Sequence, residues 1–141
     1  MDYKVDFSEP IPKMIERLKR EHRDFESRLL QIEEMSSTNS KQAIELLGHL
    51  GKSILRHAVE EEARIMRVIM QKAKDHSEQS IKVMQEHRQI IEFLDKTIPQ
   101  LKNSSLAQSA EKIKEFAEDS VKHFSEEEEI VFPLALKADS M

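Results

Sequence analysis

The sequence contains no cysteine, and this absence excludes several kinds of chemistry at once. Disulfides, thiol catalysis, iron-sulfur clusters and zinc sites built on thiolates all require that residue. Any metal site in this chain must therefore be built from histidine and carboxylate ligands.

Glycine, proline and aromatic residues are also scarce. Among 141 residues there are two Gly, four Pro, no Trp, one Tyr and six Phe, whereas 35% of the residues are charged. The chain has few of the glycines and prolines that tight turns use, and few of the aromatic residues that strands favour. The composition predicts an all-α protein, and the length fits one domain, which we expect to span residues 1–141.

Long apolar runs and patches of one charge sign are absent too. The first ten residues carry Asp2, Lys4, Asp6 and Glu9 and lack an apolar centre, so we expect no signal peptide there. No apolar run approaches membrane-spanning length. The net charge is -5, and no basic stripe suited to nucleic acid or anionic lipid interrupts the mixed charges. We expect a soluble cytoplasmic protein with no nucleic-acid and no membrane partner.

Apolar residues recur at spacings of three and four in four segments, as on the buried face of a helix. Pro99 should end the third segment, and Pro133 should kink or end the fourth. Because the connections are short, consecutive helices should be antiparallel neighbours, which gives an up-down-up-down four-helix bundle. The predicted helices cover roughly residues 10–35, 41–74, 78–98 and 105–137.

Two local features refine these helices. Ser8 is a candidate cap for the first helix, with Pro10 or Pro12 in its first turn. Gly48 and Gly51 weaken the second helix by about 1 kcal/mol each relative to Ala, and they permit a close approach by a neighbouring helix.

Each predicted helix carries one histidine within its apolar stripe, where an apolar residue belongs. The second helix also places a glutamate there, four residues after its histidine, and the fourth helix does the same. These six polar residues are His22, His57, Glu61, His87, His123 and Glu127.

An internal repeat duplicates this pattern. The tripeptide Glu21-His22-Arg23 recurs 65 residues later as Glu86-His87-Arg88, and His57 with residues 60–62 recurs 66 residues later at His123. The two histidines are 35 residues apart in the first half and 36 apart in the second. Antiparallel helices of similar length then bring all four histidines to one level of the bundle.

Six buried polar groups at one level would strongly destabilise a core that held no metal. Residues at i and i+4 share a helix face, so each His-x-x-x-Glu pair can offer a nitrogen and a carboxylate to one cluster. A carboxylate can bridge two cations about 3.5 to 4 Å apart. Zinc usually takes four ligands in a tetrahedron, so the set favours a dinuclear iron or manganese site.

The order His, His-x-x-x-Glu, His, His-x-x-x-Glu resembles the hemerythrin-like (HHE cation-binding) domain family. The segment His123-Phe-Ser-Glu-Glu-Glu-Glu-Ile-Val-Phe-Pro133 is similar to the last-helix signature of that family. The resemblance covers nearly the whole chain and implies a non-haem di-iron site with a bridging oxo or hydroxo group. It further implies that His22 and His57 serve one iron and His87 and His123 the other, with Glu61 and Glu127 bridging.

The sequence departs from the oxygen-carrying hemerythrins at one ligand. Those proteins have a fifth histidine one turn from the helix-three ligand, where this chain has Val83 or Ile91. One iron would thus have an open or water-filled position, which admits redox chemistry or sensing besides oxygen carriage. Glu26, one turn after His22, is a weaker candidate to replace the missing ligand from the side.

Other histidines and glutamates have more ordinary interpretations. The runs at residues 60–62 and 126–129 are individually typical of solvated helix faces, and only Glu61 and Glu127 fall in the stripes. Glu60 and Glu126 at i+3 remain alternative ligands, because that spacing shares the face as well. His49 and His76 have no counterpart in the repeat, so we interpret them as surface residues.

We therefore predict a metal- and oxygen-binding protein rather than an enzyme: a di-iron protein that binds, stores or senses dioxygen or nitric oxide. The alternatives are a di-iron oxidoreductase acting on peroxide or nitric oxide, and an iron donor for iron-sulfur cluster repair. An electron donor or a partner protein is not specified by the sequence.

Overall fold

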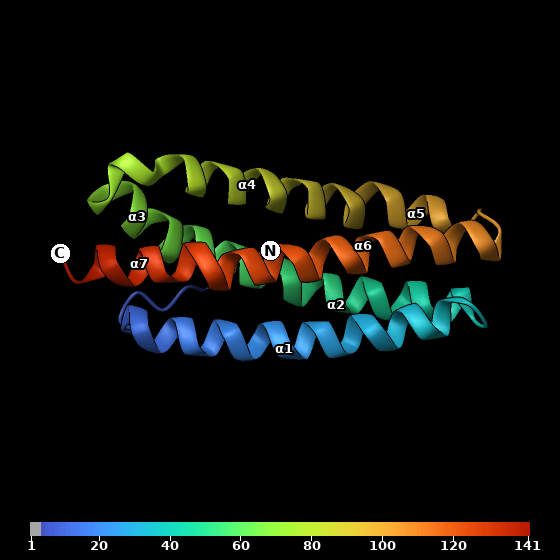
Figure 1. The fold of residues 1–141 in the computed structure, drawn as a ribbon. Coiled ribbons are helices and arrows are strands. Elements are labelled where there is room, and N and C mark those ends of the chain that lie inside the picture. Colours follow the sequence, from blue (N-terminus) through green and yellow to red (C-terminus); the bar gives the residue numbers. More distant parts are fainter. Residues whose placement is uncertain (1–3) are drawn as a thin grey trace.

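The computed structural model describes residues 4–141 as four antiparallel helical rods packed side by side (Figure 1). No strand occurs within this range, so the predicted all-α class and four-helix bundle are confirmed. No helix in these residues is long and apolar enough to cross a membrane. The rods are α1 (Ile11–Ser36); α2 (Ser40–Glu60), η1 (Glu61–Met66) and α3 (Arg67–Lys72); α4 (Ser77–Glu92), η3 (Phe93–Thr97) and α5 (Ile98–Leu101); and α6 (Leu106–Glu126), η4 (Glu127–Val131) and α7 (Phe132–Asp139).

Short connections join the rods, as predicted. Asn39 caps α2 by accepting a hydrogen bond from the backbone N–H of Gln42, and Ser105 forms a capping box with Gln108 at the start of α6. The 3₁₀ turn η2 (Lys74–His76) leads from the second rod into α4. In space α1 packs against α2 and α6, and α4 packs against α3 and α6, which closes the bundle.

The prediction that Pro99 ends the third helix is wrong, because the rod continues through it to Leu101. The residue before Pro99 and the residue before Pro133 each donate their N–H to the carbonyl five residues back: Ile98 to Phe93, and Phe132 to Glu127. These wider π-helical turns shift the hydrogen-bond register just ahead of the proline. Pro99 and Pro133 then lie in the first turn of a new α-segment, where a missing N–H is tolerated.

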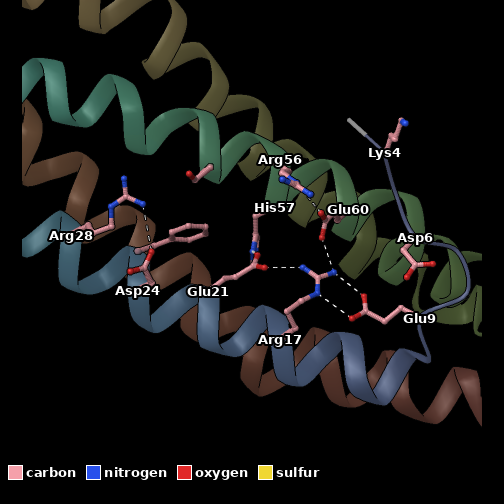
Figure 2. Close-up of a pocket in the computed structure, with 12 residues that line it drawn as sticks. Lys4, Asp6, Glu9, Arg17, Glu21, Asp24, Arg28, Arg56, His57 and Glu60 are labelled. Carbon is pink, nitrogen blue, oxygen red and sulfur yellow. Dashed lines mark hydrogen bonds and ion pairs between the residues drawn. The ribbon is translucent and has the colours of Figure 1, made fainter. Parts of the chain in front are cut away.

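Two arginines hold the segment before α1 against the bundle, and Figure 2 shows one of them, Arg17, with Glu9. Arg17 bonds the carboxylate of Glu9, and Arg64 donates to the backbone carbonyls of Asp6 and Glu9. Ser8 does not cap the helix as expected, because its hydroxyl and N–H both bond the carboxylate of Asp6. The N-terminal segment is thus held beside the first and second rods.

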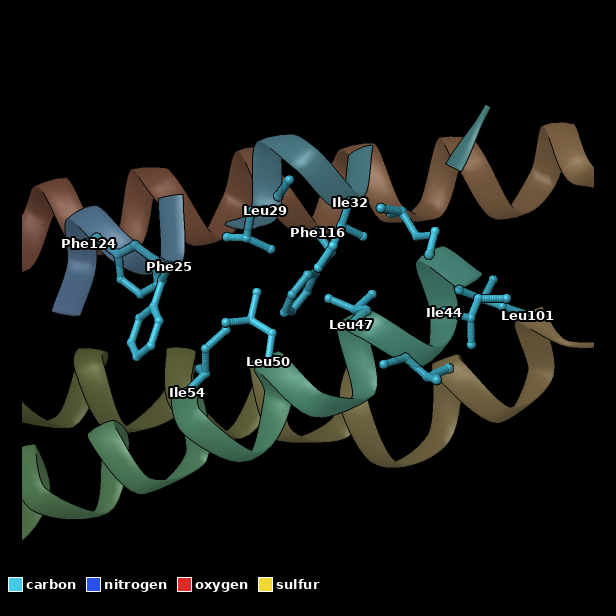
Figure 3. Close-up of a cluster of buried hydrophobic side chains, with 14 residues drawn as sticks. Phe25, Leu29, Ile32, Ile44, Leu47, Leu50, Ile54, Leu101, Phe116 and Phe124 are labelled. Carbon is cyan, nitrogen blue, oxygen red and sulfur yellow. The ribbon is translucent and has the colours of Figure 1, made fainter. Parts of the chain in front are cut away.

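Two apolar clusters fill the bundle at different levels. The first, drawn in Figure 3, contains Phe25, Leu50 and Phe116 among its buried side chains, and the second contains Leu18 and Phe132. Every rod runs from one cluster into the other, so a layer of different composition separates them. That layer holds the polar residues described next.

Candidate metal centre

All six histidines and glutamates predicted from the stripes lie in this layer. Each is at most 4% exposed, and Glu61 and Glu127 are fully buried. His22 comes from α1 and His87 from α4, whereas α2 with η1 and α6 with η4 each provide a histidine and the glutamate one turn later. The four rods thus converge on one polar site, because the repeat sets its histidines at equal depth.

The potential ligand atoms form two groups of four. Within each group, all four atoms lie within 4.8 Å of one another. His22 and His57 belong to one group and His87 and His123 to the other, while Glu61 and Glu127 belong to both. Two metal positions that share two carboxylates would have this geometry. The histidines are paired as the family resemblance implies.

The inner ring nitrogens all face the two shared carboxylates. The Nε2 atoms of His22, His57, His87 and His123 lie 3.1 to 3.4 Å from an oxygen of Glu61 or Glu127. Both carboxylate oxygens of Glu61 and of Glu127 are buried without a hydrogen-bond partner, as is Nε2 of His87. Buried lone pairs of this kind are costly unless something satisfies them, and bound cations would do so. The donor set therefore fits a metal pair.

Each outer ring nitrogen, Nδ1, is hydrogen-bonded to a carboxylate at the edge of the layer. Such a partner holds the proton on Nδ1 and leaves the Nε2 lone pair free for a metal. It also fixes the orientation of the ring. The pairs are His22 with Glu128 (2.7 Å), His57 with Glu21 (2.8 Å), His87 with Glu62 (3.1 Å) and His123 with Glu86 (3.0 Å).

The sequence interpretation missed these four carboxylates. Glu62 and Glu128 lie in acidic runs that are typical of solvated faces, and nothing in the helical spacing marks them as partners of a histidine on another rod. The signal that could have found them is the repeat, which duplicates Glu21 as Glu86 and Glu62 as Glu128. A residue duplicated beside a duplicated ligand is a candidate for supporting it.

The alternative ligands point elsewhere. Glu60 pairs with Arg17 (2.7 Å) and with Arg56 (3.3 Å), and Glu126 pairs with Lys82 (3.4 Å). Glu26 does not replace the missing histidine, because its carboxylate bonds Arg23 at 3.0 Å outside both ligand groups. His49 and His76 are exposed, as predicted.

The histidines respond differently to their burial. Burial lowers the pKa of His22 to about 4. It also lowers the pKa of His57, but the Glu61 carboxylate and the hydrogen bond to Glu21 outweigh it and raise that pKa to about 10. Their Nε2 atoms are 3.0 Å apart, so a proton on one suppresses a proton on the other.

The second pair binds protons more strongly. Burial opposes the charged form of His87, but the carboxylates of Glu127, Glu61 and Glu62 outweigh it and raise the pKa to about 12. The pKa of His123 is raised against the same burial penalty, chiefly by its hydrogen bond to Glu86. Without metal, protons on these rings therefore balance the buried carboxylates.

Comparison with known proteins gives one match. The family model described as the Hemerythrin HHE cation binding domain matches residues 13–135, a range that includes all six residues of the layer. Comparisons with curated proteins and with solved structures gave no match. The family match and the two His/Glu groups together indicate a domain that binds metal cations.

Proposed function

The chain belongs to the hemerythrin HHE cation-binding domain family, and from this premise we propose that it is a non-haem di-iron protein that binds dioxygen or a related small ligand such as nitric oxide. One observation carries the proposal: two four-residue groups share both Glu61 and Glu127. A single-metal site would not need two carboxylates common to two pairs of histidines.

In this proposal His22 and His57 would hold one iron, His87 and His123 would hold the other, and Glu61 and Glu127 would be available to both. The iron pair, when bound, supplies redox-active centres that accept a small ligand. The protein contributes the orientation of the rings, because the outer carboxylates keep the protons on Nδ1 and the lone pairs on Nε2 directed inward.

Aromatic rings support a dry environment for such a ligand. His22 stacks on Phe124 with ring centroids 4.5 Å apart and on Phe132 at 5.7 Å, and Phe25 meets the edge of His57 at 5.2 Å. Where oxygen-carrying hemerythrins have a fifth histidine, this chain has Val83 or Ile91, and neither side chain can bind metal. In the proposed site this would leave a coordination position for the small ligand.

The optical spectrum of the reduced, iron-loaded protein tests the proposed ligand. We expect a new absorption band on exposure to oxygen that disappears when the gas is removed, and a distinct spectrum with nitric oxide. Irreversible conversion to the oxidised spectrum would contradict reversible binding. Steady-state consumption of peroxide or nitric oxide with an electron donor would instead support the oxidoreductase alternative.

Iron content tests the proposed ligands. Glu61→Gln and Glu127→Gln should each lower the bound iron from two ions per chain to one or fewer, because a shared ligand serves both positions. Glu126→Gln is the matched control, since Glu126 is one residue away and pairs with Lys82 at the surface. Equal iron loss in Glu126→Gln would contradict the assignment of Glu127 as the ligand.

A further inference from the structure

The carboxylates behind His22 and His57 are each bound by an arginine. Arg17 donates to Glu21 at 2.7 Å, and that glutamate accepts from His57 with its other oxygen. Arg23 bonds the same oxygen of Glu128 that His22 contacts. Both supporting carboxylates of this metal position are therefore held from two sides.

The carboxylates behind His87 and His123 have no such support. Within residues 4–141, neither Glu62 nor Glu86 forms an ion pair with a lysine or arginine. In the sequence repeat, Lys82 corresponds to Arg17 and Arg88 corresponds to Arg23. Lys82 turns to Glu126 instead, and Arg88 is exposed and forms no ion pair with the described part of the chain.

Arg17 is itself fixed in place. Figure 2 shows its guanidinium between Glu9, Glu21 and Glu60, which it contacts at 2.7 to 2.8 Å. A planar guanidinium with several donors can hold all three carboxylates at once, whereas an ammonium holds them as a point charge. The N-terminal segment is thereby linked through Arg17 and Glu21 to His57.

Net charge does not distinguish the two positions. Around the outer nitrogens of each histidine pair, the ion-paired groups include two more carboxylates than cations. The first pair has Glu9, Glu21, Glu26, Glu60 and Glu128 with Arg17, Arg23 and Arg56, and the second has Glu62, Glu86 and Glu126 with Lys82. The difference lies in how firmly the carboxylates are held.

Ring packing also restrains His22 and His57 more than it restrains His87 and His123. His22 and His57 contact each other and the rings of Phe25, Phe124 and Phe132. Among the aromatic and imidazole rings of residues 4–141, His87 packs against that of His123 alone, and His123 in turn contacts Phe124 at 5.9 Å. The first pair of imidazoles is therefore restrained by both its outer hydrogen bonds and its neighbours.

We propose that Arg17 and Arg23 are positioning residues that make the two metal positions unequal, so that the His22/His57 position retains its metal longer. They act through Glu21 and Glu128, which orient the two imidazoles. Restraining a ligand before binding reduces the ordering cost, and supporting carboxylates typically affect metal affinity 10- to 100-fold. This inference rests on the proposed two-metal site.

Metal release kinetics test it. The protein is loaded with Fe²⁺ without oxygen, an excess of a coloured ferrous chelator is added, and the released iron is followed. We expect two phases of one iron each in the native protein. Arg17→Ala and Arg23→Ala should accelerate the slow phase roughly 10-fold and leave the fast phase unchanged, whereas the repeat-matched Lys82→Ala and Arg88→Ala should change neither phase.

Two further measurements separate positioning from general stability. Arg17→Lys should restore part of the slow phase, because a lysine can still bond Glu21. Arg23 is 58% exposed in its side chain, so Arg23→Ala should leave the melting temperature of the metal-free protein unchanged even if Arg17→Ala lowers it. Acceleration of both phases alike, or an equal effect of Arg88→Ala, would overturn the inference.

The outcome also distinguishes the inference from its premise. Two bound irons that leave in one phase from the native protein would overturn the inequality and leave the two-metal proposal intact. Binding of fewer than two irons by the native protein would contradict the proposed function itself.

Discussion

Each inward histidine has its two ring nitrogens in different surroundings. Nδ1 faces a partly exposed carboxylate, whereas Nε2 faces the buried carboxylates of Glu61 and Glu127. In the metal-free protein the second environment favours a proton on Nε2 of His57 and His87, because the positive charge offsets that of the buried carboxylates. Metal and protons thus compete for the same atoms.

Metal loading should therefore release protons. The pKa values of His57 and His87 are raised to about 10 and about 12, so both rings are protonated at pH 7.5 without metal. Binding at Nε2 requires their loss, and we expect release of at least two protons per chain. By the same linkage, metal affinity should weaken as the pH falls.

A titration of the metal-free protein with Fe²⁺, in weakly buffered solution containing a pH indicator and no oxygen, measures this release. Repeating the titration with Glu61→Gln gives the control, because removal of that carboxylate should lower the pKa of His57 and His87 and so reduce the number of protons released per iron bound. Metal binding without proton release in the native protein would contradict the assignment of these rings.

At the scale of elements, two of the three π-helical segments in the described residues, η1 and η4, coincide with the site. η1 begins at Glu61 and η4 begins at Glu127, so each shared carboxylate is the first residue of a widened turn. Such turns are frequent at functional sites. Pro133 explains the widened turn at η4, but no proline follows η1, and we have no sequence-based account of it.

The two glycines of α2 differ in their surroundings, which gives a matched pair of substitutions. A Cβ at Gly48 would meet nothing within 4 Å, whereas a Cβ at Gly51 would lie 2.8 Å from the side chain of Leu94. Only Gly51 therefore serves the close helix approach that the sequence suggested. We expect Gly48→Ala to raise the free energy of unfolding by about 1 kcal/mol.

Gly51→Ala should show no such gain, because moving Leu94 offsets the improved helix propensity. Urea unfolding of the metal-free variants measures both values. A clear stabilisation by Gly51→Ala would mean that Leu94 repacks at negligible cost, and a destabilisation by Gly48→Ala would contradict the open space around that residue.

At the scale of the whole molecule, a polar layer divides the apolar core into two clusters. The layer contains six buried polar groups, and the burial of its unpartnered carboxylate oxygens is costly without a cation, so we expect the metal-free bundle to be least stable there. Ligands that bind only the folded state stabilise it, by about 2.7 kcal/mol per site at 100 times the dissociation constant. Bound metal should therefore stabilise the folded bundle, because its ligands come from all four rods.

Saturating metal should raise the melting temperature by on the order of 10 °C. Calorimetry or circular dichroism, with and without a chelator, measures the shift. Glu127→Gln is the control, because it removes a ligand common to both positions and should lose most of the shift. An equal shift in that variant would indicate that the metal stabilises the protein from elsewhere.

The sequence alone determined the helices and the six inward residues. Apolar spacing defines which face of each helix is buried, and a histidine or glutamate within that face is visible without a structure. The repeat then sets the depth of His22, His57, His87 and His123, since antiparallel rods of equal length cross a given level once. Their role as ligands stays a prediction that the iron measurements test.

Only the tertiary structure decided what surrounds those residues. Glu62 and Glu128 occupy positions that local spacing assigns to solvent, yet each meets a histidine from a different rod. The passage of the third rod through Pro99 likewise depends on a shifted register that no local propensity encodes. The arginines that hold Glu21 and Glu128 behind His22 and His57 are a result of packing between and along the rods. Which of several carboxylates a long side chain reaches is set by distance in space.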